Sequence, residues 1–181
     1  MTALQIAAYF DSSDVVQYLC DSEGSTPLTF AKNINSTALG GAHFTLYAES
    51  SALMVALLRG SEKSIDYLID HQNGIVNQKG QTALMIAAAT NNVRAILRLV
   101  PLELQNYSAH ASPLIYAAIF GRVEATQVFL ELLKSDKYKK CVMDMLIAID
   151  NSERCPYDHA LSHMEKLSKC NTTQENKLET A

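Results

Sequence analysis

The chain is poor in the residues and motifs that mark most enzyme active sites. Only 7 of its 181 residues are glycine, and it contains neither a G-x-x-x-x-G-K phosphate loop nor a G-x-G-x-x-G dinucleotide sequence. It also lacks the G-x-S-x-G nucleophile elbow and the H-E-x-x-H zinc motif. Isolated Asp, Ser and His residues do not define a catalytic group. The sequence therefore predicts a protein that is not an enzyme and that needs no cofactor.

Long apolar runs and a basic stripe are missing too. No apolar stretch approaches the roughly 20 residues of a membrane-spanning helix, and no signal peptide precedes the first apolar helix pattern, which starts directly after Met1. The net charge of −4 argues against binding to nucleic acid. We therefore expect a cytoplasmic monomer that binds neither a membrane nor nucleic acid.

Cysteine is scarce, and no C-x-x-C pair occurs, which is typical of a reduced compartment. The four cysteines are Cys20, Cys141, Cys155 and Cys170. Cys155, His159 and His163 are spaced by four residues each, and two histidines four apart on a helix can share a zinc ion. Over eight residues, however, the helical phase turns Cys155 away from His163. We predict no metal site and keep a zinc-binding C-terminal unit as a remote alternative.

What the chain does have is one short phrase that recurs before alanine-rich apolar stretches. The copies are Thr2-Ala3-Leu4, Ser51-Ala52-Leu53, Thr82-Ala83-Leu84 and Ser112-Pro113-Leu114, with weaker copies at Thr26-Pro27-Leu28 and Cys155-Pro156-Tyr157. The later strong copies lie about 30 residues apart, and such a period indicates stacked supersecondary units.

The Thr82 copy shows the plan of one unit most clearly. Thr82 can cap a short apolar helix, and Asn91 and Asn92 then break the pattern, because Asn tolerates the turn conformation at a helix end. A second apolar helix pattern follows from Val93 and is expected to stop at Pro101. One such helix pair cannot bury its apolar face alone, so neighbouring units must supply the core.

These copies resemble the ankyrin repeat, whose consensus is Thr-Pro-Leu-His-x-Ala-Ala-x-x-Gly-His followed by Val-Val-x-Leu-Leu. Residues 82–92 and 112–121 are similar to it in register. The family also places Asp or Asn five residues before the Thr, and Gly two before it, in a hairpin finger. Asp21 with Gly24 and Asn77 with Gly80 match that finger, and Asp150 matches half of it. The resemblance implies an all-α ankyrin solenoid of stacked helix-turn-helix units with short hairpin fingers.

The resemblance covers residues 1–167, with units starting near residues 2, 26, 51, 82, 112 and 155, and residues 168–181 read as a polar disordered tail. The unit near residue 26 is degenerate, because residues 33–50 lack a clear second helix and a loop is expected around Gly40 and Gly41. An insertion near Lys134 to Lys140 lengthens the fifth unit, and its lysines are interpreted as a solvated loop. The consensus His is replaced in every unit, which puts its bonds between units in question.

By resemblance, the array should bind a protein partner in a concave groove made by the first helices and the fingers. The predicted protein-binding residues are Tyr9, Phe10, Leu58, Arg59, Gln78, Lys79, Gln81, Thr90, Ile119 and Phe120. Weaker candidates are Ser22, Glu23, Ser25, Ala89, Ser108, Ala109, Ala111, Ser162 and His163. The partner would present an apolar helix or an extended segment. Phe10 and Phe120 can alternatively be core residues that fill gaps left by the missing His.

Two roles are consistent with such an array. The chain is either a stand-alone scaffold or adaptor, or the regulatory or targeting segment of a longer signalling protein such as a protein kinase. A solenoid normally needs a polar N-terminal cap, and the first repeat phrase starts at Thr2 without one, which favours the second role.

Overall fold

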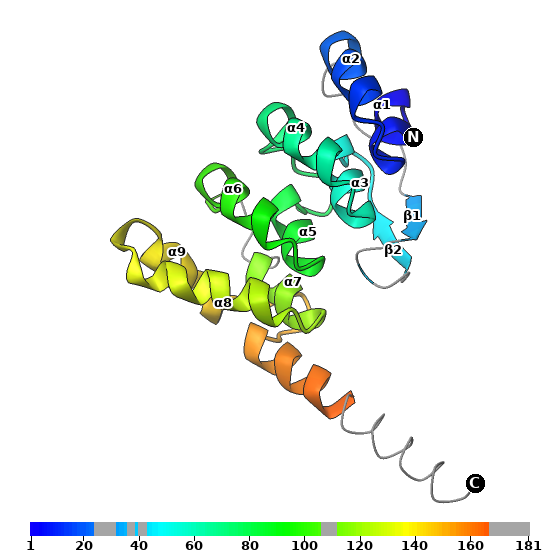
Figure 1. Cartoon of the computed structure of the whole chain (residues 1–181). Helices are drawn as coiled ribbons and strands as arrows, with labels where there is room; N and C mark the ends of the chain where they lie inside the picture. The colour runs from blue at the N-terminus through cyan, green and yellow to red at the C-terminus, as the bar shows by residue number, and fades with distance from the viewer. Residues whose placement is uncertain (24–31, 36–38, 40–42, 106–111, 167–181) are drawn as a thin grey trace, which may run out of the picture.

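The computed structural model describes residues 1–23, 32–35, 39, 43–105 and 112–166. Its helices form pairs that stack one on the next (Figure 1). The pairs are α1 (Ala3–Tyr9) with α2 (Ser13–Glu23), α3 (Ala52–Arg59) with α4 (Glu62–Gln72), α5 (Ala83–Ala89) with α6 (Val93–Glu103), and α7 (Pro113–Ile119) with α8 (Val123–Glu131). First helices contact first helices, and second helices contact second helices. The predicted all-α solenoid is confirmed.

The hydroxyl residue of a repeat phrase is the N-cap of each of these first helices. The side-chain oxygens of Thr2, Ser51, Thr82 and Ser112 accept hydrogen bonds of 3.2 to 3.4 Å from the N–H three residues later. A helix start leaves such N–H groups without partners inside the helix, so these caps stabilise it. The recurring phrase is therefore a helix-capping signal, and the units are named below after these four residues.

Gln5 replaces the consensus His of the Thr2 unit and still joins two units. Its Oε1 accepts from Thr2 N at 2.9 Å, and its Nε2 donates to Ser50 O of the next unit at 3.1 Å. The side chain is fully buried, where an unpaired amide would be costly. The bonds between units that the missing His put in question are thus present at this position.

The turn between the two helices of each unit contains a residue with positive φ. These residues are Asp11, Gly60, Asn91 and Gly121, with φ between 56° and 69°. Asp11 and Asn91 also clamp the following unit, because their Oδ1 atoms accept from Ser64 N and Ala125 N at 3.0 Å. The role predicted for Asn91 as a turn residue is confirmed, and its bond to the next unit was not anticipated.

We expect Asp11→Ala to destabilise the N-terminal end of the array by about 2 kcal/mol. The variant loses acceptors for Ser64 N at 3.0 Å and Ser64 Oγ at 2.9 Å, and alanine is strained at a φ of 56°. Asp11→Asn is the control, since Asn91 in the Thr82 unit accepts the same kind of hydrogen bond from the Ser112 unit. Urea unfolding followed by circular dichroism would measure both; equal losses for the two variants would contradict this role.

Two short strands occupy the segment between α2 and α3. β1 (Lys32–Asn35) pairs antiparallel with β2 (His43–Leu46). Phe44 and Leu46 are buried while Thr45 is exposed, which is the alternation expected of a strand with one covered face. The degenerate second unit, predicted to lack a second helix here, contains this β1–β2 pair. Its repeat phrase from Thr26 and its glycine loop lie outside the described residues.

Two predictions about the later helices are wrong. Pro101 does not end α6, which continues to Glu103; the proline lies in the last turn, where it removes one backbone hydrogen bond while Leu99, Val100 and Glu103 remain buried. The lysine-rich segment is also not a loop. It contains a short helix η1 (Leu132–Lys134) and the start of α9 (Asp136–Ile147). Its lysines are exposed, as expected, but they stand on the outer side of a helix.

The reason for α9 is an apolar spacing that the lysines obscure. Val142 and Met145 are three residues apart and both fully buried, and α9 packs against α7 and η1. Burial of one stripe is enough to stabilise a helix whose other face is charged.

Asp150 starts a finger that leads to the last described helix. Its Oδ1 accepts from Ser152 N at 2.7 Å and Arg154 N at 3.1 Å. Asn77 does the same in the finger before α5, accepting from Lys79 N and Gln81 N at 3.0 Å. The half motif thus folds like the complete one. A helix over residues 156–166 follows, and the predicted tail at 168–181 lies outside the described residues.

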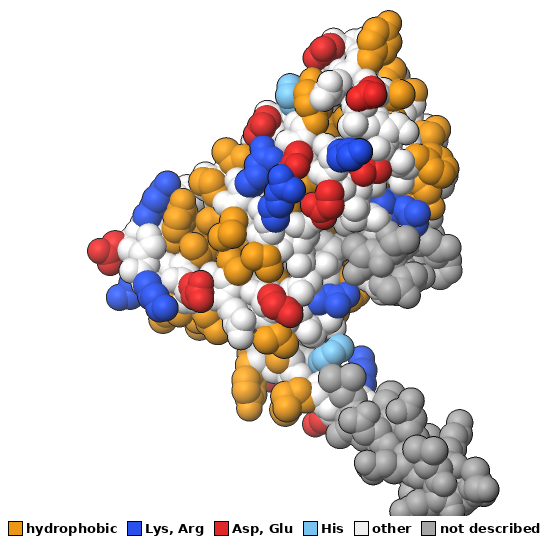
Figure 2. Space-filling view, in the orientation of Figure 1, with side chains coloured by type: hydrophobic (Ala, Val, Ile, Leu, Met, Phe, Trp, Pro, Cys, Tyr) orange, Lys and Arg blue, Asp and Glu red, His pale blue; other side chains and the backbone are white. Residues whose placement is uncertain are grey.

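The outer side of the first unit is apolar. Ile6 and Val15 are exposed, although their counterparts one unit later, Val55 and Ser64, are fully buried against the preceding helix pair. Figure 2 shows hydrophobic side chains gathered over α1 and α2. The side that each later unit buries against its predecessor is exposed in this unit.

Candidate functional site

The first helices α1, α3, α5 and α7 form one side of the array, which we call the first-helix face. In Figure 1 the β1–β2 pair lies beside this face, whereas α2, α4, α6 and α8 lie on the other side. Phe10 at the end of α1 is 71% exposed and Ile119 at the end of α7 is 40% exposed. The two ends of the face therefore present apolar side chains to solvent.

An aromatic and cationic cluster lies at the end of the face formed by α1 and α3. The rings of Tyr9 and Phe10 meet edge to face with centroids 5.0 Å apart. The guanidinium carbon of Arg59 lies 4.2 Å from the centroid of the Tyr9 ring, a cation–π contact across two units. This cluster unites three of the predicted binding residues, and we call it the Phe10 cluster.

The finger before α5 places two more of the predicted residues in solvent. Gln78 and Lys79 are exposed, and Lys79 Nζ lies 5.7 Å from the centroid of the Tyr47 ring. Gln78 N donates to Ala48 O at 3.1 Å, which joins the finger to the chain leaving β2. The finger tip is thus rigidly placed beside the first-helix face.

Three of the predicted binding residues are buried, so they do not offer a surface to a partner. Leu58 is part of the core of α3, and Thr90 Oγ1 donates to Ile86 O at 2.9 Å inside its own unit. Gln81 Nε2 donates to Tyr116 Oη at 2.8 Å. Among the weaker candidates Ala89 is fully buried as well. The equivalence of positions between units suggested exposure, but each of these side chains is enclosed by its neighbours.

Tyr116 is half-buried beside this finger. Burial raises the pKa of its phenol above the ordinary value of 10.0, although the hydrogen bond from Gln81 acts in the opposite direction. The phenol therefore stays neutral and serves as an acceptor that fixes the finger to α7.

Phe120 was predicted to be either a binding residue or a core residue, and it has features of both. It is half-buried and packs against the core, and its ring centroid is 6.1 Å from that of Phe44 in β2. Of the weaker candidates, Ser162 and His163 are half-buried on the last helix. Ser25, Ser108, Ala109 and Ala111 lie outside the described residues, as does the side chain of Glu23.

Comparison with protein-family models gives a match to ankyrin repeats over residues 32–104 and 53–143. The chain belongs to the ankyrin repeat family. Ankyrin repeats are generally modules for protein–protein interaction and are typically not catalytic. The match starts at β1, so the ankyrin-like pair α1 and α2 lies before it. A search of curated proteins finds no match to this chain.

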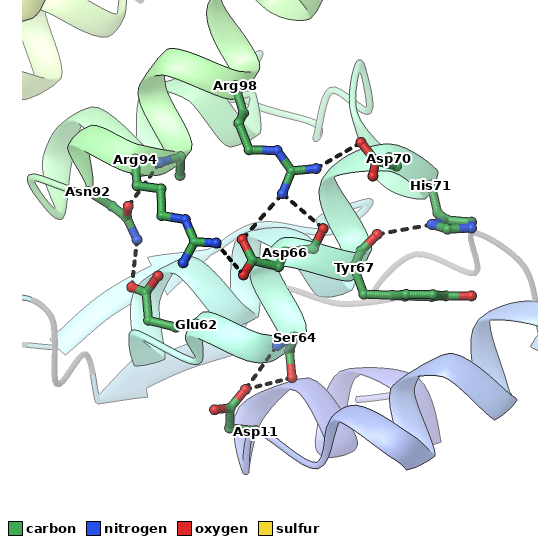
Figure 3. A network of polar contacts seen from close by, with 11 residues as sticks. Asp11, Glu62, Ser64, Asp66, Tyr67, Asp70, His71, Asn92, Arg94 and Arg98 are labelled. Atoms are coloured by element: carbon green, nitrogen blue, oxygen red, sulfur yellow. Dashed lines mark hydrogen bonds and ion pairs between the residues drawn. The ribbon is translucent and has the colours of Figure 1, made fainter.

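The second helices of the ankyrin units are joined by a polar network that sequence reasoning missed (Figure 3). Asp66 on α4 pairs with Arg94 at 2.7 Å and Arg98 at 3.2 Å on α6, and Arg98 also pairs with Asp70 at 2.9 Å. Figure 2 shows this mixture of charges over α4 and α6. Exposed ion pairs contribute about 0 to 1 kcal/mol each. In the sequence, the signal available for this network was the presence of opposite charges about one repeat apart.

One of the two histidines considered for zinc has another partner. His159 is buried and its Nε2 lies 2.7 Å from Asp150 Oδ2. Partial burial tends to raise the pKa of Asp150, but the N–H groups of Arg154 and Ser152 and the His159 ring lower it below 3.8 in balance. Among the described residues, no group of three His, Cys, Asp or Glu could hold a metal ion. Cys170 lies outside them.

Within the same described ranges, no helix combines the length and the hydropathy needed to cross a bilayer.

Proposed function

We propose that the chain is an adaptor that binds a protein partner on its first-helix face, with the Phe10 cluster as the main contact. Phe10 carries this proposal. Its side chain is 71% exposed beside a tyrosine and an arginine, so it keeps apolar surface in contact with water and adds little to the core. Exposed apolar surface of this kind is typical of an interaction site. Tyrosine and arginine are also among the residues that contribute most to binding energy at protein interfaces. Ile119 and the finger residues Gln78 and Lys79 would extend the contact.

The proposed partner meets this cluster with an apolar group. Tyr9 is held edge-on by Phe10 and covered by Arg59, so the three side chains are ordered before binding. Preorganised side chains lose little entropy on association, which favours affinity. We further propose that the adaptor acts in the cytoplasm as a monomer, in keeping with the free thiols of Cys20 and Cys155.

Phe10→Arg should weaken capture of the partner by about thirtyfold, the effect of losing one interface hot spot of about 2 kcal/mol. The matched control is Tyr18→Arg, because Tyr18 is 75% exposed in the same unit but stands on α2. Wild type and both variants would be immobilised and exposed to lysate of the source cells, with bound proteins quantified by mass spectrometry.

A protein retained by wild type and Tyr18→Arg but lost with Phe10→Arg would support the proposal. Equal retention by all three chains would count against the Phe10 cluster as the binding surface. Circular dichroism of each chain ensures that loss of binding is not loss of folding.

A further inference from the structure

We infer that β2 is an internal ligand of the first-helix face, and that the partner docks there as an extended segment with an aromatic residue and an aliphatic residue two positions later. This inference rests on the proposed function and names the chemistry of its partner. The occupant already present in the structure is Phe44-Thr45-Leu46.

The side chains of β2 divide between the array and solvent. Phe44 is 7% exposed and Leu46 is fully buried, whereas Thr45 between them is exposed. Alternate residues of an extended strand point to opposite sides, so one side of β2 faces the helices. This is how an extended peptide uses alternate side chains to fill sites on a protein surface.

The position of Phe44 shows how far β2 reaches. β2 contacts α3 of the Ser51 unit, and the Phe44 ring lies against Phe120 at the end of α7, two units further along. Both rings are aromatic and tilted by 36°, so they form a direct pair. The strand therefore bridges the Ser51 and Ser112 units on the first-helix side.

The exposed fraction of side chains on the first-helix face differs between its middle and its ends. Near the ends of the two middle first helices, Leu58 and Thr90 are buried and Arg59 is half-buried. Phe10 and Ile119 at the ends of α1 and α7 are exposed. The first-helix face is thus more open at its two ends than between them, and β2 contacts α3 in this middle part.

The β1–β2 pair differs from the helix pairs in what holds it. Its strands bond to each other over residues 32–35 and 43–46, but a pair of strands alone is at best marginally stable in water. Packing on the helices must therefore supply much of its stability. The helices, in contrast, pack on one another from α1 to α8. Displacement of the strand pair would leave the array in place and open the middle of the face.

An occupant tethered in the same chain competes strongly with any external ligand. A short tether gives an effective concentration of about millimolar, and the apparent affinity of a ligand falls by the fraction of molecules in which the site is open. Release of β2 should therefore raise affinity for an external segment of the same pattern by at least about tenfold.

The probe is a fluorescent peptide with the sequence of residues 42–48, titrated to about millimolar concentration. Its affinity would be measured by fluorescence anisotropy for wild type, Phe44→Ala, Phe44→Asp and the control Thr45→Asp. Thr45 lies next to Phe44 but faces solvent, so its substitution should leave β2 in place. We expect both Phe44 variants to bind the peptide at least about tenfold more tightly than wild type and Thr45→Asp. A peptide carrying the Phe44→Ala change should not bind.

Three results would overturn the inference. Loss of helical circular dichroism in both Phe44 variants would make β2 an integral part of the core. Equal affinity for all four chains would place the peptide elsewhere, and no binding to folded Phe44 variants would show that the face does not accept an extended segment. None of these measurements uses the cellular partner, so their failure is distinguishable from failure of the Phe10→Arg experiment.

Discussion

Glu103→Ala should lower the free energy of unfolding by about 3 kcal/mol. Glu103 is 1% exposed at the end of α6, and its two carboxylate oxygens accept from Gly74 N at 2.7 Å and Leu84 N at 2.8 Å. It thereby joins the turn after α4 to the first turn of α5. Alanine would leave both N–H groups without their acceptors. Leu84 is fully buried, and loss of the acceptor of a buried N–H costs about 1 to 3 kcal/mol, whereas the exposed Gly74 can turn to water. Urea unfolding would measure the difference.

Glu103→Gln is the matched control, because the preceding unit carries glutamine at the equivalent position. Gln72 Oε1 accepts from Leu53 N at 3.1 Å, as a glutamate oxygen does for Leu84 N. An amide at position 103 would keep one of the two bonds and direct its NH2 at the other donor. We therefore expect a loss between that of alanine and zero, and a glutamine variant as unstable as the alanine variant would contradict this account.

The pH dependence of stability, compared between wild type and Glu103→Gln, tests the effect of the Glu103 charge. Burial raises the pKa of this carboxyl above its ordinary value of 4.5, against the opposing effect of the Gly74 and Leu84 N–H groups. The folded protein then holds the proton more tightly than the unfolded chain does. The contribution of Glu103 to stability is largest below pH 4.5 and declines as pH rises through its folded pKa. The stability difference between wild type and Glu103→Gln should therefore shrink across that window.

Gly121→Ala should be the most damaging of the turn substitutions. Gly121 has a φ of 62°, and a Cβ built on it would overlap the imidazole ring of His163. The His163 side chain, or the last helix that carries it, must then move away. We expect a loss of about 1 kcal/mol from the left-handed backbone, plus the loss of packing between this turn and the last helix.

Gly60→Ala separates these two effects. Gly60 has a similar φ of 69°, but no atom lies within 4 Å of a Cβ built there. It should therefore lose only the backbone contribution of about 1 kcal/mol. His163→Ala in the Gly121→Ala background should restore stability to that level, and thermal unfolding of the double-mutant cycle would measure the coupling. Additive effects of the two changes would show that His163 does not pack on this glycine.

Local signals were the reliable part of the sequence. The cap at Thr82 and the turn at Asn91 depend on residues within a few positions of one another, so residue type and spacing located them. The finger from Asn77 to Gly80 is equally local, and the resemblance to the ankyrin repeat located it. The half finger at Asp150 was found for the same reason. Family comparison adds that the stacked units are ankyrin repeats.

Contacts between distant residues could not be read in this way. Residues 33–50 have weak local preferences, so the pairing of β1 with β2 and the meeting of Phe44 with Phe120 required the folded array. The bond from His159 to Asp150 joins a helix residue to the start of the preceding finger, and helical spacing does not bring these two positions together. The charges of α4 and α6 meet across units for the same long-range reason.

Hydroxyl caps and left-handed turn residues act within one helix pair, so the order of the residues is enough to set the register of the units. Which equivalent positions are exposed depends instead on how the units pack. Phe10 and Thr90 occupy the same place in their units, yet Phe10 is exposed and Thr90 is buried. Burial depends on what packs over each residue, and that differs between the first unit and a unit inside the stack.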